Sequence, residues 1–155
     1  MDKNIILSKR EEIQKLQELL ISEADGINIE GDGKTILHSD NFPLKHTFAD
    51  GIYIRQMDMK TGSAVIGAIH NHLHAWFLLA GRLVVATEDL IEEYVAPCYV
   101  LATPGSKRVI YAVEDSIFIN IHKNPNNIKD INKLELEIVS KTFKDYEKYI
   151  NNKNK

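Results

Sequence analysis

The chain has 155 residues, of which 44% are apolar and 26% charged, and its formal net charge at pH 7 is -3. This length suits one hydrophobic core, so we expect a single domain over residues 1–155. The lysines are scattered among acidic residues and form no basic stripe that would follow a phosphate backbone, which argues against a nucleic-acid partner.

The single cysteine, Cys98, leaves no intramolecular disulfide and no thiolate cluster for zinc, which favours a reducing cytoplasm. Only three consecutive apolar residues precede Ser8, far fewer than a signal-peptide core or a membrane span needs. We therefore expect a cytoplasmic protein without a membrane partner.

A helix is expected in an N-terminal helical segment over residues 1–26. Ser8 and Glu11 have the spacing of a capping box, and four apolar residues then fall on one helical face: Ile13, Leu16, Leu19 and Leu20. This pattern predicts a helix from about Ser8 to Ala24, ended at Gly26.

The middle of the chain predicts antiparallel strands. From Ile52 to His122, short runs rich in Val, Ile, Tyr and Phe alternate with turn sequences such as Ala80-Gly81 and Pro104-Gly105. Regularly spaced short strands are typical of a sandwich or barrel, and we expect a barrel core over residues 45–123. Helical spacing returns in the segment 126–150, which predicts one or two C-terminal helices. The expected fold is thus mainly β, a jelly-roll antiparallel barrel with flanking helices.

The strongest chemical signal is the run His70-Asn71-His72-Leu73-His74. On a continuous strand, alternation would place the three imidazoles on one face. Imidazole binds divalent iron, manganese, nickel and zinc, so the run predicts a metal site. Three such histidines would span roughly 13 Å, and we expect only two of the three to reach one ion.

A remote ligand is predicted at His122. Ser116, Phe118, Asn120 and His122 alternate with three isoleucines, so Asn120 and His122 share a face. If the isoleucines pack outward against the helices, His122 points into the barrel; the reversed register remains open. The alternative is that the histidines lie on the surface and bind nothing.

Four residues are candidates for ligand binding: Asn120, which shares the face of His122, and Arg108, Trp76 and Tyr111. Arg108 follows a turn and, if it points inward, can hold a carboxylate or phosphate; a salt bridge to Glu114 or Asp115 is the alternative. Trp76 continues the histidine face and can wall the pocket, although a core position is more common for this residue type. Tyr111 is a second candidate to stack on a ligand.

The spacing of Gly62, His70, His74 and Gly81 resembles the first sequence motif of the cupin superfamily. That motif has a glycine, a histidine pair, an acidic residue and a turn glycine, and the resemblance implies a cupin-type barrel. Its glutamate slot falls on His74, its second histidine slot on His70 and its first on Ala68.

The turn Pro104-Gly105 resembles the second cupin motif, but the histidine slot there falls on Arg108, whose guanidinium stays protonated and cannot ligate a metal. The implied ligand set therefore departs from the usual one.

A second resemblance is to small cupin-like proteins encoded by tailed bacteriophages. It rests on the segments His46–Arg55, Ala96–Cys98, Pro104–Arg108 and Glu114–His122, within about Lys45 to Pro125. It implies a phage or prophage origin, a host-cytoplasmic location, and no particular reaction.

Three functions follow from these observations. The first is a small-molecule binding module that holds a divalent metal, an anionic ligand or both; in a phage, the ligand would be a host nucleotide signal. The second is a metal-dependent enzyme of oxygenase, isomerase or lyase type acting on a small carboxylate or phosphate. The third is a dimeric scaffold with incidental histidines, and a homodimer is expected by analogy with other cupins.

Overall fold

The computed structural model describes residues 9–15 and 42–154. Residues 9–15 are helical, as predicted, and the rest of the expected N-terminal helix lies outside the described residues. The Arg10 guanidinium pairs with the buried Glu88 carboxylate at 3.2 Å, which ties this segment to the strands. No helix within the described ranges is both long and apolar enough to cross a membrane.

The described chain is mainly β, with two C-terminal helices. The strands are β1 (Leu44–Ala49), β2 (Ile52–Met59), β3 (Ala64–Ile66), β4 (Ile69–His70), β5 (His74–Ala80), β6 (Arg82–Ala86), β7 (Ile91–Val95), β8 (Cys98–Ala102), β9 (Val109–Ala112), β10 (Ser116–Lys123) and β11 (Val139–Ser140). The helices are α2 (Ile131–Ile138) and α3 (Phe143–Lys153).

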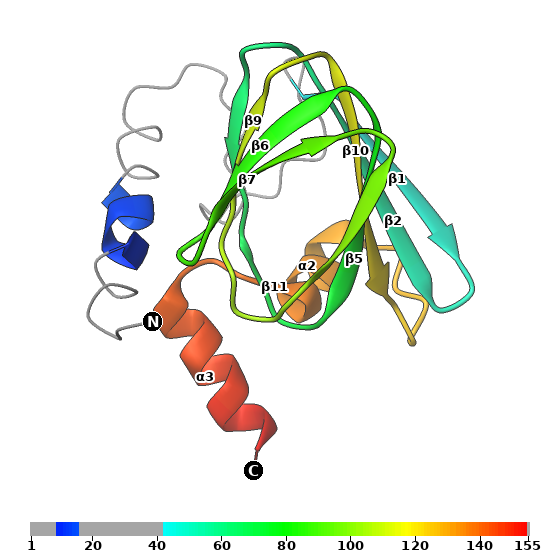
Figure 1. Cartoon of the computed structure of the whole chain (residues 1–155). Coiled ribbons are helices and arrows are strands. Elements are labelled where there is room, and N and C mark those ends of the chain that lie inside the picture. Colours follow the sequence, from blue (N-terminus) through cyan, green and yellow to red (C-terminus); the bar gives the residue numbers. More distant parts are fainter. Residues whose placement is uncertain (1–8, 16–41, 155) are drawn as a thin grey trace.

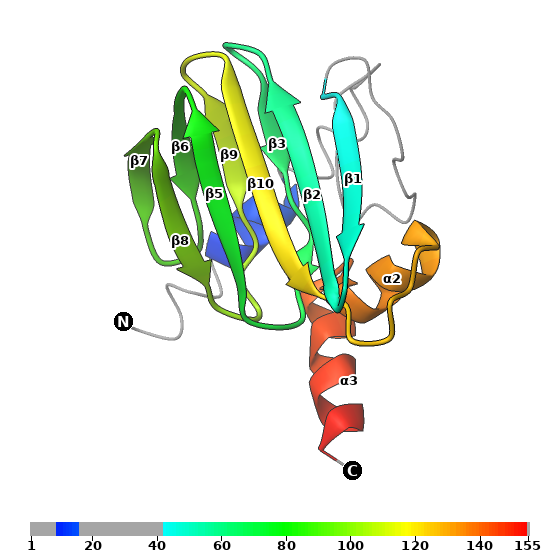
Figure 2. The same cartoon turned by 90° about the vertical axis from the view of Figure 1, so that its right-hand side faces the viewer.

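Two antiparallel sheets face each other across the core (Figures 1 and 2). The larger has the order β1-β2-β10-β5-β8 and the smaller the order β3-β9-β6-β7. Their facing sides enclose the main hydrophobic core, whose large members include Trp76, Leu78, Leu83, Ile110 and Phe118. The mainly β jelly-roll prediction is confirmed, with the qualification that the hydrogen-bond ladders form these two facing sheets and a short β11-β4 pair, and not one continuous barrel.

The predicted turn at Ala80-Gly81 joins β5 to β6 and requires glycine. Gly81 has a φ of +84°, and a Cβ at this position would lie 2.3 Å from the Asp115 carbonyl oxygen. The left-handed backbone conformation and the lack of space for a Cβ both exclude a side chain here, so this turn requires glycine.

The helices lie at one end of the two sheets (Figure 2). Leu134 and Ile138 of α2 are buried and pack with Tyr53 in a second apolar cluster. The following strand, β11, pairs with β4 through Val139 opposite His70. In α3, the Tyr146 ring lies against Gly105, so this part of the helix packs on the protein's own fold.

Candidate functional site

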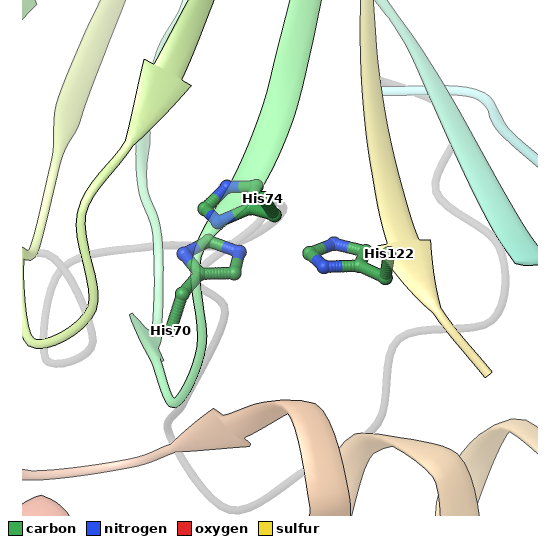
Figure 3. Close-up of side chains that lie close together, drawn as sticks. All are labelled: His70, His74 and His122. Carbon is green, nitrogen blue, oxygen red and sulfur yellow. The ribbon is translucent and has the colours of Figure 1, made fainter. Parts of the chain in front are cut away.

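Three buried histidines from three strands meet in the interior. His70 ends β4, His74 begins β5 and His122 lies near the end of β10 (Figure 3). One ring nitrogen from each lies within 4.8 Å of the others, and the side chains are nearly inaccessible to solvent. We call these residues the histidine triad.

The strand register explains how His74 and His122 meet. Ile121 on β10 pairs with Ala75 on β5, so the next inward positions along the two antiparallel strands are His122 and His74. The prediction that Asn120 and His122 share a face is confirmed. Of the two registers left open, the inward one is formed, since both residues are buried while the three isoleucines of β10 face outward. The expected packing of these isoleucines against helices is wrong for the described residues, because α2 and α3 lie at the end of the sheets (Figure 2).

The predicted spread of the histidine run over roughly 13 Å is wrong, because residues 70–74 do not form one strand. The chain bends at Asn71 and His72 between β4 and β5. This bend brings the rings of His70 and His74 into a stack with centroids 4.0 Å apart. The middle residue, His72, lies outside the triad, although its Nε2 is 3.4 Å from His122 Nδ1.

The C-terminal segment holds this bend in place. The Asn71 backbone N–H donates to the Ile138 carbonyl at 2.8 Å, and the Ser140 hydroxyl donates to Asn71 Oδ1 at 2.6 Å. On the other side, the Gly105 N–H donates to the His70 carbonyl at 2.9 Å. His70 is therefore fixed by contacts from residues far away in the sequence.

Arg108 points inward, which is one of the two alternatives that the sequence left open, and it contacts the triad directly. Its Nη2 lies 3.2 Å from His74 Nε2 and 3.4 Å from His70 Nδ1. Because a guanidinium is only a donor, both ring nitrogens accept these long hydrogen bonds with their lone pairs. The alternative salt bridges are not formed: Glu114 pairs with Arg82, and Asp115 pairs with Lys60.

Burial keeps the imidazoles neutral. Desolvation lowers the pKa of His72 to about 4 and that of His74 to about 3, and it lowers the pKa values of His70 and His122 well below the usual range. The positive charge of Arg108 adds to this effect at His70, His74 and His122. The neutral imidazole, which is the metal-binding form, is thus the state at neutral pH.

The triad fits a divalent ion after small movements. Histidine nitrogens bind zinc at roughly 2.1 Å, so two ligands of one ion are at most about 4.2 Å apart. The ring nitrogens of the triad lie within 4.8 Å of one another, so ring shifts of less than about 1 Å would bring them into ligand distance. A metal would also have to replace Arg108 at the nitrogens of His70 and His74.

Sequence reasoning missed two buried cations near this region. Arg55 lies on the inner face of β2 and pairs with Glu135 at 3.2 Å. Together with His70, Arg108 and Asn120 it lines a small interior cavity. Alternation along β2 puts Arg55 on the same face as Tyr53 and Met57, so the sequence carried a signal for its burial. The sequence carried no such signal for the burial of Lys107. Burial lowers the pKa of Lys107 to about 8.

Two of the predicted ligand-binding residues are not brought to the triad. Trp76 is packed in the hydrophobic core, with its ring centroid 5.2 Å from that of Phe118 and 4.9 Å from that of Tyr94. Tyr111 is 45% exposed, because alternation along β9 points its neighbour Ile110 inward and Tyr111 outward. The prediction that Tyr111 stacks on a ligand in this pocket is therefore wrong.

His72 connects the triad with the surface. It lines a solvent-open pocket together with Lys123, Leu136 and Tyr149, among others. The His72 ring also contacts His122. The site is thus an interior cluster of imidazoles and cations with His72 between it and the open pocket.

The described chain has a cupin-type fold, and its interior holds the histidine triad. No protein-family model and no curated protein matches the sequence. Among solved structures, the chain is similar to a protein of Photorhabdus luminescens, with a TM-score of 0.51, 12% identity, and coverage of 67% of this chain and 93% of the other.

Two further solved structures are similar over comparable lengths. KdgF from Halomonas sp. has a TM-score of 0.51 and 13% identity, with 64% of this chain and 90% of the other covered. A cupin 2 conserved barrel domain protein from Salinispora arenicola has a TM-score of 0.49 and 13% identity, with 66% and 92% covered. At these identities the similarity concerns the fold alone, and the bacteriophage origin stays a prediction.

Proposed function

We propose that this pocket binds a divalent metal ion through His70, His74 and His122, and that Arg108 receives the anionic group of a small molecule bound beside the ion. The observation that carries the proposal is the meeting of three buried, neutral imidazoles from separate strands within 4.8 Å. Iron, manganese, nickel and zinc are all compatible with imidazole ligands.

The protein's own residues define how such a ligand would be held. When bound, the metal would supply a Lewis acid for an oxygen-bearing ligand. Arg108 would leave the ring nitrogens of His70 and His74 and present its guanidinium to a carboxylate or phosphate, for which its fork-shaped donor set is suited. The proposed function is therefore the binding of a metal and a small anionic molecule. A metal-dependent reaction on a small carboxylate or phosphate is the enzyme alternative that the sequence also suggested.

A metal-free anion pocket is the second candidate, and the charges around the site favour it. The charged side chains that lower the pKa values of the four clustered histidines are cations, namely Arg55, Arg108, Lys123 and Lys153. An anion bound near Arg108 would be attracted by these positive charges and would stabilise the folded protein. Such an anion would not require the triad nitrogens to rearrange.

Metal content decides between the two candidates. Protein prepared without a histidine tag would be loaded with zinc, iron, manganese or nickel, desalted and measured by elemental analysis. We expect near-stoichiometric metal in the wild type, its loss in His74→Ala and His122→Ala, and its retention in the matched control His72→Ala, which removes a neighbouring imidazole outside the triad.

Two outcomes would contradict the metal proposal. One is the absence of metal uptake by folded wild-type protein. The other is equal metal content in wild type, His74→Ala and His122→Ala. Should metal be absent while phosphate or a small carboxylate raises the melting temperature of the wild type and not of Arg108→Met, the anion pocket would be the function.

A further inference from the structure

The open pocket beside His72 lies where the end of β10, α2 and α3 meet, at one end of the sheets (Figure 2). Its volume of about 310 Å³ is enough for a small organic molecule. The described residues that line it include neither Arg108 nor a member of the histidine triad. They are His72, Lys123, Pro125, Leu136, Glu137, Ile138 and Tyr149. The open pocket is therefore separate from the site described above.

Part of the lining is apolar and exposed to water. Leu136 of α2 is 73% exposed, while Ile138 in the same helix is buried. Tyr149 of α3 presents a half-buried ring, and the Lys153 Nζ lies 5.7 Å from the centroid of that ring. This cation–π contact helps to hold the ring in one orientation. A flat apolar group packed on Leu136 and Tyr149 would remove both from water.

The charge around the open pocket is positive on balance. Burial, followed by the charges of Lys123 and Lys153, lowers the pKa of His72 to about 4, so both ammonium groups lie near the imidazole. Both lysines are exposed, and neither forms a salt bridge with another residue that the structure describes. Among the described lining residues the acidic one is Glu137, so two cations face one carboxylate. An anionic group is attracted to such a surface.

We propose that the open pocket is a second ligand site, which binds a small molecule that carries a flat apolar ring and a carboxylate. The ring packs on Leu136 and Tyr149, and the carboxylate accepts hydrogen bonds from the ammonium groups of Lys123 and Lys153. Neither the metal nor Arg108 takes part in this site.

The ring and the charge are both required. Salt bridges that are open to water are weak, so two exposed lysines by themselves hold a small anion poorly. The apolar contact supplies the remaining affinity, and the lysines select an anionic ring over a neutral or cationic one. Benzoate carries both features, whereas acetate lacks the ring and benzamide lacks the charge.

The test is a titration of benzoate into the full-length, metal-free protein, followed by the backbone amide shifts in two-dimensional NMR spectra. We expect saturable shifts at His72, Leu136 and Tyr149. The dissociation constant should be at least about 10-fold larger in Lys123→Gln and in Tyr149→Ala, and at least about 10-fold larger for acetate and for benzamide.

Two matched controls remove the same side-chain types elsewhere. Lys148→Gln removes an α3 ammonium group that pairs with Asp145, and Tyr99→Ala removes a tyrosine that is 67% exposed on β8. Both variants should bind benzoate with the affinity of the wild type. All variants should keep the wild-type circular dichroism spectrum.

A fourth variant separates this site from the proposed function, which also expects a carboxylate at Arg108. The shifts around the open pocket should persist in Arg108→Met. Shifts that vanish in Arg108→Met and persist in Lys123→Gln and Tyr149→Ala would belong to the proposed function and would overturn this inference. It is equally overturned if wild-type protein shows no saturable shift up to about 10 mM benzoate, or if benzylamine binds as tightly as benzoate.

Discussion

Replacing Arg108 by methionine should tighten metal binding, because the guanidinium occupies one ring nitrogen of His70 and one of His74 and places a positive charge beside the triad. Its Nη2 lies 3.2 Å from His74 Nε2 and 3.4 Å from His70 Nδ1. Once the arginine has turned aside to free those nitrogens, the guanidinium would still be on the order of 5 Å from a bound ion. At an effective dielectric constant of about 20, the repulsion between the divalent ion and the guanidinium is then roughly 7 kcal/mol.

Only part of this repulsion should appear in the measured affinity. The arginine side chain can swing away at the cost of its two long hydrogen bonds, each worth about 1 kcal/mol. We therefore expect Arg108→Met to lower the metal dissociation constant by about 10- to 100-fold, which corresponds to roughly 1.4 to 2.8 kcal/mol. Methionine keeps much of the buried volume and removes the charge, so the core should tolerate the change.

The assay is isothermal titration of zinc or cobalt into metal-free protein, in a buffer without phosphate or carboxylate. The matched control is Arg82→Met, which removes a half-exposed arginine paired with Glu93 and Glu114 on the surface. Unchanged or weaker metal binding in Arg108→Met, with a wild-type melting temperature, would refute the idea that Arg108 competes with the ion. It would instead place Arg108 among the groups that support the metal.

Two further predictions concern stability. The metal-free protein should be less stable at pH 5 than at pH 7, because the unfolded chain takes up protons on histidine near pH 6.5 while burial lowers the pKa of His74 to about 3 in the folded state. His74 alone contributes about 2 kcal/mol to this loss, which urea unfolding in the presence of a chelator would measure; equal midpoints at the two pH values would refute it. Gly81→Ala should lower the free energy of unfolding by more than about 2 kcal/mol, because its Cβ would lie 2.3 Å from the Asp115 carbonyl oxygen at a φ of +84°. A melting temperature equal to that of the wild type would contradict this explanation of the turn.

The sequence by itself determined the features that depend on local periodicity. Alternation from Ser116 to His122 predicted that Asn120 and His122 share a face, and the β-rich runs with their turn glycines predicted the strands between Ile52 and His122. The spacing of Ile131, Leu134 and Ile138 predicted α2. These features are fixed by two- and four-residue periods and by turn chemistry, which act within a few residues.

The tertiary structure alone decided which side chains meet. The bend at Asn71 and His72 puts His70 and His74 in contact and leaves His72 outside the triad. That bend is held by Ile138 and Ser140, nearly seventy residues away in the chain. Sequence periodicity carries no information about such contacts, because they depend on how β4, β11 and α2 pack at the end of the two sheets. For the same reason only the tertiary structure shows that residues of the bend, β10, α2 and α3 line the open pocket together.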